Sequence, residues 1–247
     1  MDNAQAALYF HTIFREAEIA WAFIHEKKYV SGTYDDPASK STFYRKYTCK
    51  DNINAIDVTI NYNAWVSNHL LLSGTIIVQF PLNSYHSDGM VANVLLTGFS
   101  INGHDVRGES SIKYKKGSND QYTYNVFEGA IHEEGYSKPV LITGSITNGQ
   151  YERTEEDETS SQDDDVWVYY GTMKGMLHND PKLNYTNEIL ISYTDGGEVK
   201  NGKVHYKMDC ETYRRQGVSK ISIPNRPEII YGYFCSNIDF VSVTNVH

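Results

Sequence analysis

Eight acidic side chains gather in residues 152–165, against the single base Arg153, and are the first candidates for chemistry. Glu155 and Asp157 are two residues apart, the spacing that places two side chains on the same face of a strand. Retaining glycosidases hold their two carboxyl groups about 5 Å apart, which such a spacing suits. Ser160 stands where a further acid would be needed, and the run has the composition of an exposed loop. We therefore expect no catalytic residue here, and an acid-based glycoside hydrolase is the least favoured function.

Metal sites and cofactor motifs are also not predicted. His132 and Glu133 open an H-E-x-x-H pattern, but Tyr136 stands where the second histidine is required. Asp163–Asp165 offer oxygen ligands for calcium, although the glycine and glutamate spacing of an EF-hand loop is missing. The chain also has no glycine-rich phosphate loop. We expect the protein to bind no metal and no cofactor, and we expect it not to be an enzyme.

Aromatic side chains are the second group that could form a site, since 20 tyrosines contribute most of an aromatic content of 13%. Rings exposed on a sheet can stack on sugars or hold a peptide. The candidates for such a surface are Trp65, Trp167, Tyr169, Tyr170, Tyr231 and Tyr233. Tyrosine is equally at home in strands for structural reasons, because it buries its ring and keeps its hydroxyl near water. Structural use is the favoured interpretation, and a carbohydrate- or peptide-binding β module is the second functional alternative.

The three cysteines, Cys49, Cys210 and Cys235, leave two interpretations open. Cys210 and Cys235 can pair and leave Cys49 as a thiol, or all three can be buried thiols that pack as small apolar groups. A metal site of cysteines is not favoured because the chain has no C-x-x-C motif.

An N-terminal helix is predicted within residues 1–30. Apolar residues recur there at spacings of three and four, which is the pattern of a packed helix. The stripe consists of Phe10, Ile13, Phe14, Ala17, Ala20, Trp21 and Ile24. Lys27 and Lys28 follow it with the positive charge that a helix C-terminus favours. We expect this stripe to cover one face of a sheet.

Residues 42–247 change to a period of two, the pattern of half-buried strands. Asn-Gly pairs at 102–103, 148–149 and 201–202 predict tight hairpin turns. No second helical pattern separates the strands, which argues against βαβ units. The predicted fold is therefore mainly β: an extended twisted antiparallel sheet, or a β-sandwich, of about twelve strands with the helix packed on it. We expect residues 1–247 to form one domain.

The net charge of −9 lies mostly in residues 152–165, so the remaining surface is nearly neutral. An acidic chain without a basic patch is a poor partner for a nucleic-acid backbone. No apolar run reaches the roughly 18 residues of a transmembrane helix. The first residues also show neither the basic nor the apolar region of a signal peptide.

The C-terminal half resembles the ending of a group of exported Bacteroidetes lipoproteins to which no enzymatic activity is assigned. The matching segments there are Lys207–Cys210 (KMDC), Gln216–Ile221 (QGVSKI) and Tyr231–Asn237 (YGYFCSN). Upstream, the hairpin Leu95–Gly108 and the strand Ser73–Val78 match the same group. Three positions depart from the group's pattern: Tyr233 replaces a glycine, Ser236 replaces an aspartate, and Leu72 replaces an arginine. No catalytic residue transfers from this group.

The resemblance implies a location in the cell. Members are exported and held at the cell envelope by a lipid on an N-terminal cysteine, which would place that cysteine before Met1. An oxidising compartment would then permit a Cys210–Cys235 disulfide. The favoured function is therefore a non-enzymatic exported cell-envelope protein, periplasmic or anchored at the outer membrane or cell surface. Its expected partners are a glycan or an envelope protein, and its membrane contact is the lipid anchor alone.

Overall fold

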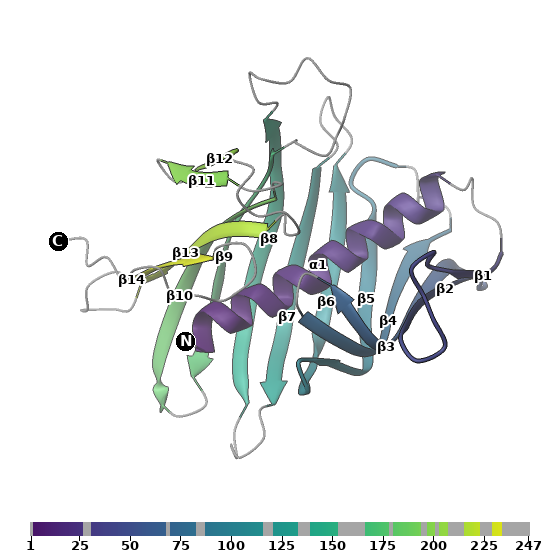
Figure 1. The fold of residues 1–247 in the computed structure, drawn as a ribbon, viewed down its shortest axis with the longest axis horizontal. Coiled ribbons are helices and arrows are strands. Elements are labelled where there is room, and N and C mark those ends of the chain that lie inside the picture. The colour runs from purple at the N-terminus through teal and green to yellow at the C-terminus, as the bar shows by residue number, and fades with distance from the viewer. Residues whose placement is uncertain are drawn as a thin grey trace.

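The computed structural model describes residues 2–26, 31–67, 70–82, 87–115, 121–132, 139–152, 166–177, 180–193, 197–200, 203–206, 215–222 and 229–233. One helix, α1 (Asp2–Glu26), precedes all the strands (Figure 1). The strands are β1 (Gly32–Asp35), β2 (Tyr44–Asp51), β3 (Ala55–Ser67), β4 (Leu70–Pro81), β5 (Val91–Ile101), β6 (His104–Lys115), β7 (Gln121–His132), β8 (Val140–Glu152), β9 (Val166–Leu177), β10 (Asp180–Tyr193), β11 (Gly197–Lys200), β12 (Lys203–Tyr206), β13 (Arg215–Ser222) and β14 (Ile229–Tyr233).

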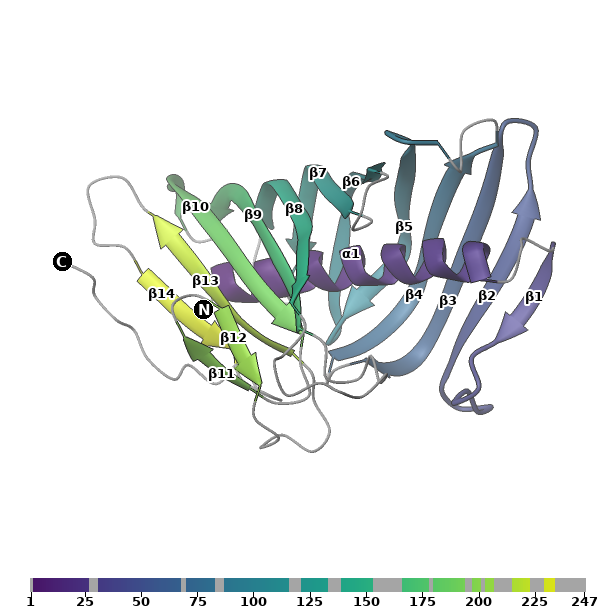
Figure 2. The same cartoon turned by 90° about the horizontal axis from the view of Figure 1, so that it is seen from above.

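Strands β1 to β10, followed by β13 and β14, form one open antiparallel sheet in chain order. Strands β11 and β12 pair with each other as a separate ribbon. The predicted class, a mainly β protein with an antiparallel sheet and one N-terminal helix, is confirmed. Of the two predicted architectures, the structure has the single curved sheet (Figure 2). Among the described residues, no helix is long and apolar enough to cross a bilayer.

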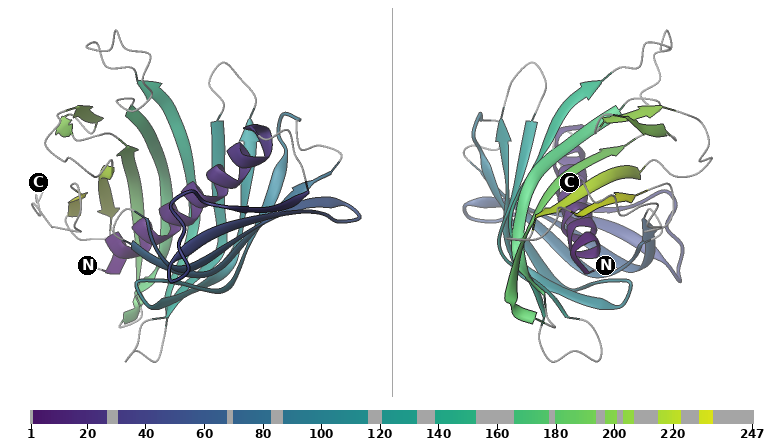
Figure 3. Two further views of the ribbon diagram at one scale, coloured as in Figure 1. Left: turned by 45° about the vertical axis from the view of Figure 1, so that its right-hand side comes forward. Right: turned by 90° about the vertical axis from the view of Figure 1, so that its left-hand side faces the viewer.

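The helix lies in the hollow of the curved sheet, and the strands bend around it (Figure 3). All seven residues of the predicted stripe are at most 4% exposed. Phe14 stacks on Tyr124 of β7 with ring centroids 5.6 Å apart, and Trp21 packs 4.8 Å from Tyr114 of β6. The helix also buries polar residues that flank the stripe, which the sequence did not predict. Its buried polar residues are His11, Thr12, Glu16 and Glu18.

Irregular pairing bends the middle of the sheet. Every neighbouring pair from β3–β4 to β9–β10 contains a register shift, whereas the pairs at the two ends of the sheet contain none. Such bulges bend a strand and increase its twist. At Gly74 the backbone has a φ of 96°, and a β-carbon there would overlap the carbonyl oxygen of Gly98 on β5. The curvature that encloses the helix therefore depends on bulges and on close backbone approach.

Of the three predicted Asn-Gly turns, the structure confirms one, contradicts one and does not describe the third. Asn102 and Gly103 have φ values of 54° and 82° and connect β5 to β6, as a two-residue hairpin turn requires. Asn148–Gly149 is not a turn, contrary to prediction: both residues lie inside β8, at its register shift against β9. The Asn201–Gly202 prediction and the acidic segment 153–165 lie outside the described residues.

Candidate functional site

The residues of the predicted aromatic surface lie on three strands, β3, β9 and β14. Trp167, Tyr169 and Tyr170 lie on β9, and Tyr231 and Tyr233 lie on β14. Strands β10 and β13 separate β9 from β14 in the sheet. The backbone therefore does not place these aromatics on adjacent strands, and their side chains lie outside the part that the structure describes in detail.

Trp65, a candidate for an exposed aromatic surface, is only 8% exposed and joins the core, as the favoured structural interpretation expects. The reason is a bulge between Tyr62 and Trp65, at which Ala64 has a φ of 45°. The extra residue reverses the alternation of inward and outward side chains. Trp65 consequently turns inward, and Val66 is 63% exposed instead.

A buried ionic cluster joins the helix to the first strands and contains the types of residue that often act in catalysis. Glu16 Oε2 accepts a hydrogen bond of 2.8 Å from the Tyr62 hydroxyl and one of 3.3 Å from Arg45 Nη1. Arg45 also donates through Nη2 and Nε to Asp36 Oδ2, at 2.6 and 3.1 Å. Its guanidinium lies 5.0 Å from the ring centroid of Trp65.

The electrostatics of this cluster favour a structural role. Burial raises the pKa of Tyr62 well above its ordinary value, and the charge of Glu16 adds to the effect, so the hydroxyl stays protonated and keeps donating. Burial alone would lower the pKa of Arg45, but Glu16 and Asp36 outweigh it and raise the value. A buried pair that is this well hydrogen-bonded holds elements in place. We interpret the cluster as the clamp that fixes the helix in the sheet.

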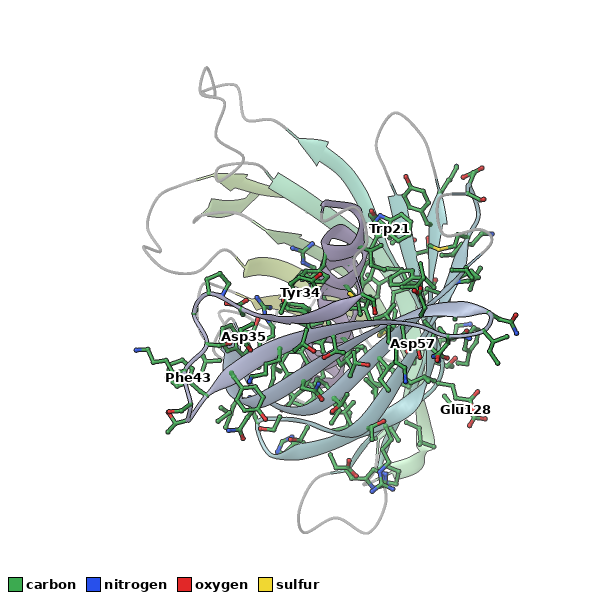
Figure 4. The ribbon with its side chains drawn as sticks, turned by 90° about the vertical axis from the view of Figure 1, so that its right-hand side faces the viewer. Trp21, Tyr34, Asp35, Phe43, Asp57 and Glu128 are labelled. Carbon is green, nitrogen blue, oxygen red and sulfur yellow. The ribbon has the colours of Figure 1, made fainter. Side chains whose placement is uncertain are left out.

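The convex face, away from the helix, carries a shallow depression of about 410 Å³ over β7, β8 and β9. It is lined by Asn125, Val126, Phe127, Thr143, Gly144, Ser145, Thr172 and Lys174. The bulge of β7 between Val126 and Gly129 turns two consecutive side chains outward, Phe127 and Glu128. Phe127 is 57% exposed and forms the apolar side of the depression. Glu128 projects from the outer surface of the sheet (Figure 4).

Polar groups from β8 and β9 form the other side of the depression. Thr143 and Lys174 are directly paired across these strands, as are Ser145 and Thr172. The Thr143 hydroxyl donates to the carbonyl oxygen of Val126 at 2.9 Å. This hydrogen bond ties β8 to the start of the β7 bulge. The depression thus joins one flat apolar ring to hydroxyl, amide and ammonium groups. This composition suits an amphipathic ligand that carries hydroxyl groups.

The remaining predicted residues do not add to this site. Cys49 is 3% exposed on β2, whereas Cys210 and Cys235 lie outside the described residues. Within the described ranges, no three histidine, cysteine, aspartate or glutamate side chains are placed to hold a metal ion.

Sequence reasoning missed Phe127 as a site residue, although one signal was present. Tyr122, Tyr124 and Val126 alternate along the chain in the pattern of one strand face, which assigns Phe127 to the other face. Tyr124 and Val126 are indeed buried, and Phe127 is exposed. The depression itself has no sequence signal, because it arises where three strands meet.

No family model, curated protein or solved structure matches this chain. The site must therefore be interpreted from its own geometry.

Proposed function

We propose that this protein is a non-enzymatic, exported cell-envelope protein that binds a saccharide in the depression on its convex face. The observation that carries the proposal is Phe127, a large apolar ring that is 57% exposed beside the hydroxyl, amide and ammonium groups of the depression. Leaving such a ring in water gives up the burial energy of a large apolar surface, and a ligand would recover part of it.

The chemistry of the depression supports a sugar. A pyranose ring has an apolar face of C–H groups and a rim of hydroxyls, so it can meet an aromatic ring and polar side chains at once. The Ser145 and Thr172 hydroxyls and the Asn125 amide are suited to the rim. The shallow, open shape favours part of a longer saccharide over a small molecule that must be enclosed.

The position of the helix supports a binding role over catalysis. A curved sheet offers its hollow as the natural place for a deep cleft, and here α1 occupies that hollow (Figure 3). The reactive-looking groups Glu16, Arg45 and Tyr62 are engaged with one another there. The acids that suggested a hydrolase, Glu155 and Asp157, lie outside the described residues. Export rests on the lipoprotein resemblance alone.

A glycan array followed by calorimetry tests the proposal. We expect the protein to bind a saccharide, and Phe127→Ala to weaken binding about tenfold or more, since fully burying a phenylalanine ring contributes about 1.5–3 kcal/mol. Val91→Ala on β5 is the matched control, because Val91 is an exposed apolar residue (46%) outside the depression. Binding to a peptide panel but to no glycan would contradict the proposal, as would equal effects of the two substitutions.

A further inference from the structure

The charge of the depression narrows the class of saccharide. Lys174 is the only charged residue among those that line it. Its side chain is exposed, and the ion pairs found in the described part of the chain do not include it. An ammonium group placed in this way can meet an anionic group of a ligand without first breaking an internal pair.

The neighbouring polar groups also have capacity to bind. Within the described residues, the side chains of Asn125, Ser145 and Thr172 make no hydrogen bond, while Thr143 already donates to Val126. Two hydroxyls and one amide are therefore available beside the Lys174 ammonium. Together they provide several donors on the β8–β9 side of the depression.

The opposite side has the reverse charge. Glu128 follows Phe127 in the bulge and lies directly across from Glu109 on β6, and both side chains are exposed. Two carboxylates on neighbouring strands repel an anion at this edge. The Glu109 and Glu128 carboxylates thus lie on the β6–β7 side, beyond Phe127, and the Lys174 ammonium lies on the β9 side, while Arg107 and Lys113 of β6 are exposed as well. Within the depression, the one charged group that can meet an anionic sugar is Lys174.

We infer that the depression takes an acidic saccharide, with its apolar ring face on Phe127 and its carboxylate or sulfate at Lys174. The inference rests on the proposed function and adds the charge of the ligand and its orientation. Carboxylated and sulfated sugars share the required chemistry, so the experiment includes both.

Calorimetric titration with three probes tests the inference. The probes are an oligogalacturonate, a neutral galactan fragment of similar length, and the same galactan in sulfated form. We expect at least one acidic probe to bind about threefold to tenfold more tightly than the neutral one, the range of a partly exposed charged hydrogen bond. Lys174→Gln should abolish this preference. Lys113→Gln, at an exposed lysine of β6, should retain the preference.

The outcomes separate the two claims. If neither acidic probe binds more tightly than the neutral galactan, or if Lys174→Gln retains the preference, the acidic-saccharide inference is overturned and saccharide binding stands. If neither these probes nor any glycan on the array binds, the proposed function fails as well. A preference for the carboxylated or for the sulfated probe identifies which anion the site accepts.

Discussion

Gly129 of β7 lies directly against Phe10 of the helix. A β-carbon at Gly129 would overlap Phe10 Cζ and come within 2.8 Å of the Cγ2 atom of Ile142 on β8. Phe10 is 1% exposed, so its ring is enclosed by the core. Gly129 follows the bulge that presents Phe127 on the other face. The seat of the helix and the proposed binding site therefore share one short segment of β7.

Substituting Gly129 tests how tightly the helix is seated. We expect Gly129→Val to lower the free energy of unfolding by about 1–3 kcal/mol, because overpacking forces neighbouring side chains from their positions. Phe10→Leu in the same chain should restore part of the loss. Chemical denaturation measures both. Gly32→Ala is the control, since its nearest neighbour would be 3.4 Å away. A Gly129→Val protein as stable as the control would show that the helix is not packed as described.

The ionic clamp gives a second prediction. Glu16→Ala removes one partner of a buried pair and leaves Arg45 and Tyr62 without their acceptor, so we expect a loss of about 3–5 kcal/mol in unfolding free energy. Arg107→Ala breaks an ion pair with Asp105 whose side chains are 70% and 37% exposed, and should cost at most about 1 kcal/mol. Urea unfolding of both variants compares them directly. Equal losses would contradict the role of the clamp.

A third prediction concerns alkaline pH. Burial raises the pKa of Tyr124 above its ordinary value, although its hydrogen bond to Ser110 opposes the shift. The folded state therefore keeps the proton longer than the unfolded chain does. The stability from this group is present below about pH 10, the unfolded value, and is lost as pH rises toward the folded value.

Denaturation at increasing pH measures this loss. Tyr124→Phe should reduce the slope of stability against pH above about pH 10 by up to about 1.4 kcal/mol per pH unit. Phe14→Leu, which alters the ring that stacks on Tyr124, should lower stability equally at every pH. If Tyr124→Phe has the same alkaline slope as the native sequence, Tyr124 does not titrate in this way.

The cysteines provide a test of the export proposal. From protein isolated from an oxidising compartment, denatured without reduction, we expect one reactive thiol, that of Cys49. Reduction should then release the thiols of Cys210 and Cys235. If all three thiols react before reduction, the predicted disulfide is absent.

The elements of this fold were predictable where they depend on local pattern. The helix stripe from Phe10 to Ile24 and the Asn102–Gly103 turn follow from spacing and residue type, and both are confirmed. Asn148–Gly149 has the same local preference, yet β9 continues to pair on both sides of it. Long-range pairing therefore outweighed the turn preference and produced a bulge.

The functional residues were less predictable because they depend on contacts between distant segments. Glu16 meets Arg45 and Tyr62 across 29 and 46 residues of chain. Trp65 changed face because one bulge shifted the alternation of β3. Phe127 is exposed as its position in the alternation implies, but its polar neighbours come from two later strands.

An NMR titration with the tightest-binding saccharide tests the central claim most directly, since it locates the ligand without any substitution. We predict that the backbone amide signals of Phe127, Thr143, Ser145 and Lys174 shift together and saturably. Signals around Val66 and Leu71, which are exposed on β3 and β4 away from the depression, should remain in place. Shifts confined to those strands, or to α1, would contradict a saccharide site on the convex face of β7–β9.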